Sequence, residues 1–153
     1  MKEYEYSKCV DDLKKYTDYC EKNDYILKEK ISQVRTIYRK SDSTIARITI
    51  NDNNGVVTKE LDFKEDKLSS QELIIRRESL PLNFDDDSII FSILEFLNYK
   101  KDNTIKRTRY IYENDKVKFE FDEYIEPDKR KVISIEGDKE LVDKIWLEIS
   151  NIN

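Results

Sequence analysis

Charged or polar side chains recur at every second position in seven segments of the sequence, the spacing that places residues on one face of a β-strand. Because residues i and i+2 of a strand lie about 7 Å apart on that face, each row could present its side chains to one ligand. The rows are Glu3 and Glu5; Arg47 and Thr49; Glu60, Asp62 and Lys64; Arg76 and Glu78; Arg107 and Arg109; Lys118, Glu120 and Asp122; Ser134 and Glu136. Each row alone is more typical of the solvated side of an antiparallel sheet, so only their combination indicates a site.

The combination suits a polyphosphate together with a hard metal ion. Guanidinium groups match phosphate oxygens, and carboxylates are preferred ligands of Mg²⁺ and Mn²⁺. The sequence contains no histidine, which excludes His-based triads and His-ligated zinc. Its only glycines are Gly55 and Gly137, so neither glycine-rich phosphate-binding motif can be present. A phosphate site must therefore be built from side chains.

The rows require β-strands, and the sequence contains patterns that predict both strands and helices. Alternation predicts strands at 2–9, 31–39, 44–50, 56–64, 72–80, 104–112, 115–125 and 130–137. Apolar residues at helical spacing predict helices at 10–23, 83–99 and 138–149, and FDDDS supplies an acidic cap for the second. Turn residues in NDNNG and at Asn114 and Asp115 join neighbouring strands into hairpins.

The apolar faces of the three helices need apolar sheet surface to cover. The strand faces opposite the charged rows supply it, in Tyr4 and Tyr6, Ile48 and Ile50, Phe119 and Phe121, and Ile133 and Ile135. If the sheet closes with the helices outside, the charged rows are forced inward; an open sheet would leave them in water.

The composition narrows the classes of function. A length of 153 residues indicates one domain, 1–153, and ten Tyr and six Phe argue against disorder. With 28 basic and 33 acidic residues the formal charge is -5, which disfavours an extended nucleic-acid surface. The sequence has neither a stretch typical of a membrane span nor an apolar signal core, so it predicts a cytoplasmic protein without a membrane partner. Cys9 and Cys20 fit no zinc pattern and are expected to be reduced packing residues.

From Glu3 to about Ile145, the order of these segments resembles the CYTH superfamily, also called triphosphate tunnel metalloenzymes. This superfamily includes class IV adenylate cyclases, thiamine triphosphatases, inorganic triphosphatases and some RNA triphosphatases. In the first half, EYEYS resembles its E-x-E-x-K strand, ARIT its L-R-x-R strand, LDFK its L-T-x-K strand and IRRES its R-x-E strand. The residues that match are Glu3, Glu5, Arg47, Lys64, Arg76 and Glu78.

The second half resembles the same family. ILEFLNYKKDNTIKRTRYIY resembles its L-G-F helix end and K-x-R strand, KVKFEFDEYI the strand that carries L-D-E-V, and VISIEG the closing E-x-E. Arg107 stands in the lysine place, and the direct matches are Arg109, Asp122 and Glu136. Three positions depart from the pattern, because Ser7 replaces a lysine, Thr49 an arginine and Ser134 a glutamate.

The resemblance implies an α+β fold, a closed antiparallel barrel of about eight strands that forms a charged tunnel with helices packed outside. It implies Mg²⁺ or Mn²⁺ as cofactor. The expected phosphate-binding residues are Arg47, Lys64, Arg76, Arg107, Arg109 and Lys118. The expected metal ligands are Glu3, Glu5, Asp122 and Glu136, with Glu78 and Glu120 as further candidates. The expected catalytic residues are Glu5, Glu78 and Asp122.

The implied function is metal-dependent hydrolysis of a triphosphate, whether inorganic triphosphate, thiamine triphosphate or a nucleoside or RNA 5′-triphosphate. Two alternatives stay open. One is an enzyme like the class IV adenylate cyclases, and the other is a barrel that binds or sequesters nucleotides or polyphosphate without catalysis, which the three departures favour. The sequence leaves the organic part of the ligand, the number of metal ions and the oligomeric state, a homodimer included, undecided.

Overall fold

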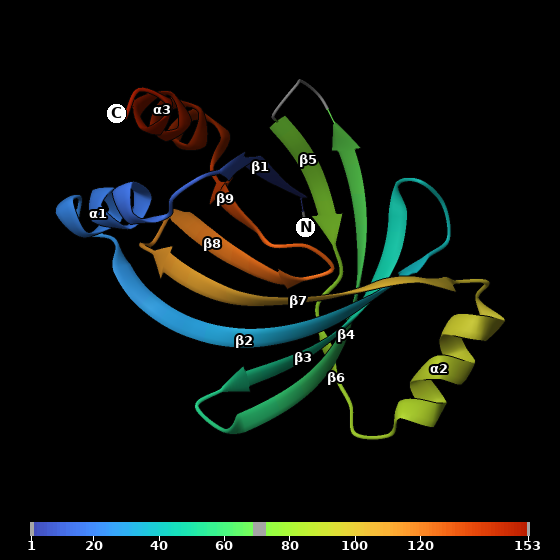
Figure 1. Cartoon of the computed structure of the whole chain (residues 1–153). Helices are drawn as coiled ribbons and strands as arrows, with labels where there is room; N and C mark the ends of the chain where they lie inside the picture. Colours follow the sequence, from blue (N-terminus) through green and yellow to red (C-terminus); the bar gives the residue numbers. More distant parts are fainter. Residues whose placement is uncertain (1, 69–72, 153) are drawn as a thin grey trace.

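The computed structural model describes residues 2–68 and 73–152, the side chains of residues 2, 3 and 68 excepted. In these residues eight antiparallel strands close into a barrel, with three helices outside it (Figure 1). The barrel strands are β1 (Lys2–Val10), β2 (Ile26–Arg39), β3 (Thr44–Asn53), β4 (Val56–Leu68), β5 (Leu73–Glu78), β7 (Lys100–Glu113), β8 (Val117–Glu126) and β9 (Arg130–Gly137). The two-residue β6 (Leu82–Asn83) pairs with β4, and the helices are α1 (Lys14–Lys22), α2 (Asp87–Phe96) and α3 (Lys139–Ser150).

The strands follow one another around the barrel in the order β3-β2-β7-β8-β9-β1-β5-β4, and pairing of β3 with β4 closes the ring. Closure leaves none of the eight strands with an open edge, which removes a route to aggregation. Alternation alone does not show whether the charged rows face the solvent or an interior. A closed sheet has an interior, and one set of alternating side chains must face it. The predicted α+β barrel with a charged interior and external helices is confirmed.

Two separate hydrophobic clusters lie between the outside of the barrel and the helices. Helices α1 and α3 cover the β8–β9–β1 side (Figure 1), where Phe119, Phe121, Ile133 and Ile135 are each at most 1% exposed. Helix α2 places Ile90 and Leu94 against Ala46, Ile48 and Leu61 of β3 and β4. The barrel is therefore stabilised from outside, and its interior is left for polar side chains.

Local residues fix where these elements begin and turn. The Asp86 carboxylate accepts hydrogen bonds from the backbone N–H of Ser88 at 3.0 Å and of Ile89 at 3.4 Å, so it caps α2 as the acidic run predicts. The Asn114 side chain accepts from the N–H groups of Lys116 and Val117 in the β7–β8 hairpin, which confirms the predicted turn.

Strands β2 and β7 are longer than the sequence pattern predicts. The sequence pattern predicts that β2 begins at residue 31 and β7 at residue 104. In the structure β2 begins at Ile26 and β7 at Lys100. The two pair with each other along nearly their whole length, and this ladder extends both beyond the alternating segments. Cys9 and Cys20 are both free thiols, as expected, but only Cys20 is a buried packing residue, because Cys9 is exposed. Among the described residues, no helix has the length and apolarity needed to cross a bilayer.

Candidate functional site

The barrel encloses a cavity of about 800 Å³ whose wall is built from the inward faces of all eight strands. Among the side chains that the structure describes, eight acidic and seven basic ones line it, which confirms that the charged rows face inward. The acidic ones are Glu5, Glu29, Glu60, Asp62, Glu78, Glu120, Asp122 and Glu136. The basic ones are Arg35, Arg47, Lys64, Arg76, Arg107, Arg109 and Lys118.

Three glutamates from adjacent strands form a carboxylate cluster: Glu5 of β1, Glu120 of β8 and Glu136 of β9. One oxygen from each lies within 4.8 Å of the other two, and all three residues are buried. The cluster arises because Glu5 and Glu136 are register partners and Glu120 lies two residues from Lys118, the partner of Glu136 on β8. Three hard oxygen donors this close together fit a divalent cation such as Mg²⁺ or Mn²⁺.

The three carboxyls of this cluster have different pKa values. Burial and the neighbouring Glu120 together raise the pKa of Glu136 to about 7, against the opposing charge of Lys118. Burial also raises the pKa of Glu5, and Arg76 is the main opposing charge. Burial acts on Glu120 as well, but Arg109 and Lys118 outweigh it and lower its pKa to about 2. Glu120 is therefore ionised at neutral pH, whereas Glu136 titrates close to it.

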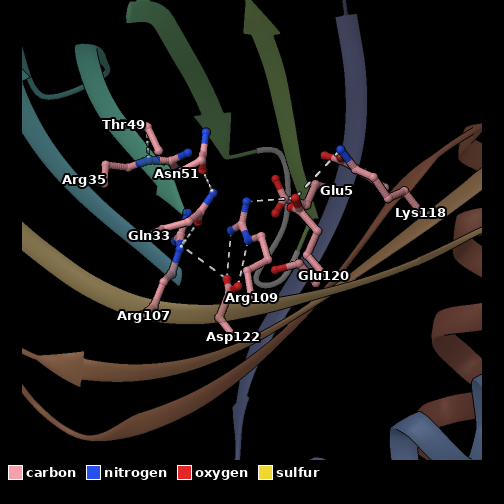
Figure 2. A network of polar contacts seen from close by, with 12 residues as sticks. Glu5, Gln33, Arg35, Thr49, Asn51, Arg107, Arg109, Lys118, Glu120 and Asp122 are labelled. Atoms are coloured by element: carbon pink, nitrogen blue, oxygen red, sulfur yellow. Dashed lines mark hydrogen bonds and ion pairs between the residues drawn. The ribbon is translucent and has the colours of Figure 1, made fainter. Parts of the chain in front are cut away.

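Each carboxylate of the cluster also has a basic partner. Arg76 Nη1 lies 2.6 Å from Glu5 Oε2, and Lys118 Nζ lies 2.6 Å from Glu136 Oε1. Arg109 donates to Glu120 at 2.8 Å and grips Asp122 with two further nitrogens (Figure 2), at 2.7 and 2.8 Å.

The wall formed by β3, β4 and β5 carries a second ion-pair network. Arg47 donates through Nε to Asp62 at 3.0 Å and through Nη2 to Glu78 at 3.1 Å. Asp66 accepts from Arg76 at 3.0 Å and lies 3.0 Å from the ammonium of Lys64. Burial and the neighbouring Arg76 lower the pKa of Lys64 to about 8, although Asp66 opposes them.

A third group of polar residues comes from β2, which the sequence pattern did not single out. Gln33 accepts a hydrogen bond from Arg107 Nε at 2.8 Å, and Arg107 Nη1 donates to the Tyr124 hydroxyl at 3.0 Å. Arg35 donates through Nε to Thr49 Oγ1 at 2.9 Å (Figure 2). The only signal for these residues in the sequence was the alternation of Gln33 and Arg35 within ISQVR. It was weak because this segment contains a single charged residue.

Every predicted site residue whose side chain is described lines the cavity, and these are Glu5, Arg47, Lys64, Arg76, Glu78, Arg107, Arg109, Lys118, Asp122 and Glu136. The Glu3 side chain lies outside the described part of the structure; its backbone is the register partner of Arg76. The Asp122 carboxylate accepts hydrogen bonds from Arg109 and does not belong to the carboxylate cluster. Glu120 is the residue that joins Glu5 and Glu136 there.

The departures from the family pattern occupy related places in the wall. Ser7 and Ser134 are register partners on β1 and β9, and their hydroxyl oxygens lie 3.1 Å apart. Thr49 is the register partner of Arg35 and accepts its hydrogen bond. Ser7 and Ser134 thus form a neutral hydroxyl pair where the family pattern has a lysine and a glutamate. Thr49 stands where the pattern has an arginine, and Arg35 of the neighbouring strand lies beside it.

No protein-family model and no curated protein matches the chain, but solved structures do. The PH1819 protein from Pyrococcus horikoshii OT3 superposes with a TM-score of 0.72 at 18% identity, over 99% of this chain and 91% of that one. HpAC1 from Hippeastrum, a protein with a dominant triphosphatase activity, superposes with a TM-score of 0.69 at 15% identity, over 96% and 85%. A chain of the Schizosaccharomyces pombe Mediator head module gives 0.67 at 9% identity, over 100% and 97%.

These superpositions cover nearly the whole of each chain, and the protein therefore has the triphosphate tunnel fold. The resemblance to the CYTH superfamily is confirmed at the level of the fold. Because the same barrel occurs in a triphosphatase and in a component of the Mediator head module, the fold does not define the activity. The activity has to be argued from the cavity.

Proposed function

We propose that the protein hydrolyses a triphosphate-containing substrate inside the barrel with the help of Mg²⁺ or Mn²⁺. One observation carries the proposal: the carboxylate cluster of Glu5, Glu120 and Glu136 opens into the same cavity as seven basic side chains. A phosphate chain needs cations along its length, and a divalent ion needs oxygen ligands at a fixed place. The cavity offers both within one bore.

The basic side chains would bind the phosphate oxygens. Arg47, Arg76 and Lys64 reach the cavity from three strands, with Arg107, Arg109 and Lys118 on the other wall. Each now holds a carboxylate or a polar group, so the ligand would share or replace these partners. The planar donor forks of the arginines suit bidentate contact with phosphate oxygens.

Glu5, Glu120 and Glu136 would hold the metal ion, with Asp122 and Glu3 as the other ligands that the family resemblance implies. When bound, a divalent cation neutralises charge on the phosphate oxygens and so lowers the barrier to phosphoryl transfer. The donor set fits such an ion, because the cluster is buried and Glu5 Oε2, although 2.6 Å from Arg76, has no aligned hydrogen-bond donor within the described structure.

Two further carboxylates would act by orienting arginines. Glu78 accepts from Arg47 and lies 3.5 Å from Arg76, and Asp122 holds two nitrogens of Arg109. Fixed guanidiniums need less reorganisation when negative charge builds up on a transferring phosphoryl group, which favours the transition state over the ground state. Among the expected catalytic residues, Glu78 and Asp122 are therefore proposed as positioning residues.

The second candidate is a barrel that binds a triphosphate without hydrolysing it. It is favoured by the basic partner that each cluster carboxylate already has, and by the Ser7–Ser134 pair in place of two charges. A cyclase is less well supported. Tyr124 is the only aromatic residue among the described lining residues, and the guanidinium carbons of Arg107 and Arg130 lie 5.6 and 4.4 Å from its ring centroid. Little aromatic surface is left on which an adenine could stack.

One substrate panel separates these functions. Phosphate release and cyclic nucleotide formation are measured with tripolyphosphate, thiamine triphosphate, ATP and 5′-triphosphate RNA, each with Mg²⁺ or Mn²⁺, and binding is measured in parallel by calorimetry. Metal-dependent phosphate release supports the triphosphatase. Tight binding without turnover supports the second candidate, and formation of a cyclic product would overturn both.

A further inference from the structure

Arg35 is a cation inside the barrel that has no acidic partner among the described residues. It lies on β2, in register with Thr49 of β3, and its single hydrogen bond to a described group is the one from Nε to the Thr49 hydroxyl. The terminal nitrogens of its guanidinium therefore carry donors that no described carboxylate accepts. Arg35 is half-buried, and arginines largely withdrawn from water are usually paired, because an isolated charge there is costly.

The surroundings of Arg35 are themselves positive. Burial lowers its pKa, and Arg107, Arg47 and Arg109 lower it further, while Asp62 opposes them. In the ligand-free protein, the charge of Arg35 is therefore unfavourable. Such a charge is retained at a cost in stability, which is a common sign of a functional position.

Arg107 lies on the same side of the cavity and has a donor without an acceptor. Its side chain is 4% exposed, and within the described structure its buried Nη2 atom has no hydrogen-bond partner. The nearest carboxylate, Asp122, lies 3.7 Å from Nη1 and is already held by two nitrogens of Arg109. Arg107 thus lines the cavity and keeps one buried N–H for which the described structure holds no acceptor.

A chain of side-chain amides holds this guanidinium in place. Glu60 accepts from the Asn51 amide at 2.7 Å, Asn51 accepts from Gln33 at 2.8 Å, and Gln33 in turn accepts from Arg107 Nε. Each amide is oriented by the next and the last by the Glu60 carboxylate, so the group that Arg107 Nε contacts directly is a neutral amide. In Figure 2, Arg35 and Arg107 lie on one side of Arg109, and Glu5 and Lys118 lie on the other.

We propose that Arg35 and Arg107 form an anion subsite on the β2–β7 side of the cavity, and that this subsite takes one phosphoryl group of the ligand on the side of Arg109 away from the carboxylate cluster. The inference rests on the proposed function only for the identity of the anion as a triphosphate. Two guanidiniums with unused donors can share the oxygens of one phosphoryl group, and its negative charge would offset their repulsion. The metal-binding end and this end would then hold opposite parts of the same ligand.

The test compares the unmodified protein with Arg35→Gln. Calorimetric titration without metal uses inorganic triphosphate and, separately, inorganic phosphate. The substitution should weaken binding of inorganic triphosphate roughly tenfold to hundredfold, the usual effect of losing a hydrogen-bonded charge. Arg39→Gln is the matched control, since Arg39 lies on the same strand but pairs with Asp102 on the surface, and its affinity should equal that of the unmodified protein.

A second measurement separates binding from a structural role. Arg35→Gln should unfold at the same or a higher temperature than the unmodified protein when no ligand is present, because it removes a charge that its neighbours repel. A structural role predicts a lower temperature. If Arg35→Gln does not fold, Arg35→Met supplies the same binding test with an apolar side chain of similar length.

The outcomes distinguish this inference from the proposed function. Equal affinity of Arg35→Gln and the unmodified protein for inorganic triphosphate overturns the subsite, even if the protein is a triphosphatase. Binding that is weakened by the substitution, in a protein that releases no phosphate, supports the subsite and contradicts hydrolysis. Failure of the unmodified protein to bind either anion without metal overturns the subsite, while hydrolysis is judged by the substrate panel with Mg²⁺ or Mn²⁺.

Discussion

Lys118 on β8 and Glu136 on β9 are register partners, and their Nζ and Oε1 atoms lie 2.6 Å apart at the carboxylate cluster. Glu120 and Glu136 raise the pKa of Lys118, so the ammonium stays charged and balances the cluster while no cation is bound. A divalent cation at Glu136 would take over that role. Lys118 would then be free to turn toward a phosphate oxygen, which links metal binding to ligand binding.

Metal affinity should increase with pH between about 6 and 8. The pKa of Glu136 is about 7 and that of Glu5 is raised, so at lower pH a cation must displace a proton. Loss of one proton on binding weakens the apparent affinity by about tenfold for each pH unit below the pKa. Titration of Mn²⁺, followed by its paramagnetic resonance signal at pH 6, 7 and 8, measures this. An affinity that does not vary over this range would contradict the assignment of Glu136 as a ligand.

The stability of the metal-free protein should vary with pH in the opposite sense. Folding raises the pKa of Glu136 from 4.5 to about 7, and burial also raises the pKa of Glu5. Between these values the folded state binds more protons than the unfolded state, so the free energy of unfolding decreases as pH rises from about 4.5 to 7. Urea denaturation at pH 5, 6 and 7 tests this. In Glu136→Gln the decrease should be smaller, and an identical slope would show that Glu136 does not titrate as inferred.

Alternation in the sequence predicts the inward rows because each strand has only two faces and the external helices need the apolar one. It does not predict which rows meet. Glu120 lies with Glu5 and Glu136, whereas Asp122 lies against Arg109, and this difference is set by the stagger between β8 and its neighbours. Side-chain spacing fixes the face of a strand, but register depends on the closure of the whole barrel.

The role of β2 was missed for a related reason. Its inward row holds Glu29, Ile31, Gln33 and Arg35, so two uncharged residues separate the two charged ones and the alternation of charge is weak. Only the pairing of β2 with β3 and β7 places Arg35 beside Thr49 and Gln33 beside Arg107. These are contacts between segments far apart in the sequence, which local spacing cannot encode.

Glu5→Gln should abolish most metal-dependent turnover. Glu5 is 4% exposed and belongs to the carboxylate cluster, so the substitution removes one ligand charge while keeping the shape of the side chain. We expect phosphate release from inorganic triphosphate to fall by about 10²- to 10³-fold, the typical effect of removing one preorganised electrostatic contact. Glu123→Gln is the control, since Glu123 is exposed on the outer face of β8 and should leave the rate unchanged. Full activity in Glu5→Gln would remove Glu5 from the metal site.

Arg109→Ala should destabilise the protein as well as weaken ligand binding. It would leave Asp122 and Glu120, which are 2% and 8% exposed, without their guanidinium partner. Loss of one partner of a buried ion pair typically costs about 3–5 kcal/mol. In the double variant Arg109→Met with Asp122→Leu, the loss in the free energy of unfolding should be smaller than the sum for the two single variants. Additive losses in denaturant unfolding would show that the pair is not coupled.

The Ser7–Ser134 pair offers a test of whether the departures from the family pattern reduce activity. The two side chains face each other across β1 and β9 at 3.1 Å, so Ser7→Lys alone or Ser134→Glu alone would place an unpaired charge in the barrel wall. Each single variant should therefore lower the unfolding temperature, and the double variant should recover part of the loss through a lysine–glutamate pair. Because Ser134 is also the register partner of Glu120, the new glutamate would add a carboxylate beside the cluster.

The double variant should therefore bind Mn²⁺ more tightly than the unmodified protein. If it also hydrolyses inorganic triphosphate faster, the hydroxyl pair limits turnover in the natural sequence. If it binds Mn²⁺ more tightly but releases no phosphate, the barrel is a binder for reasons other than these two positions. If the unfolding temperature of the double variant falls by as much as the two single losses added together, Ser7 and Ser134 are not close enough for their replacements to pair.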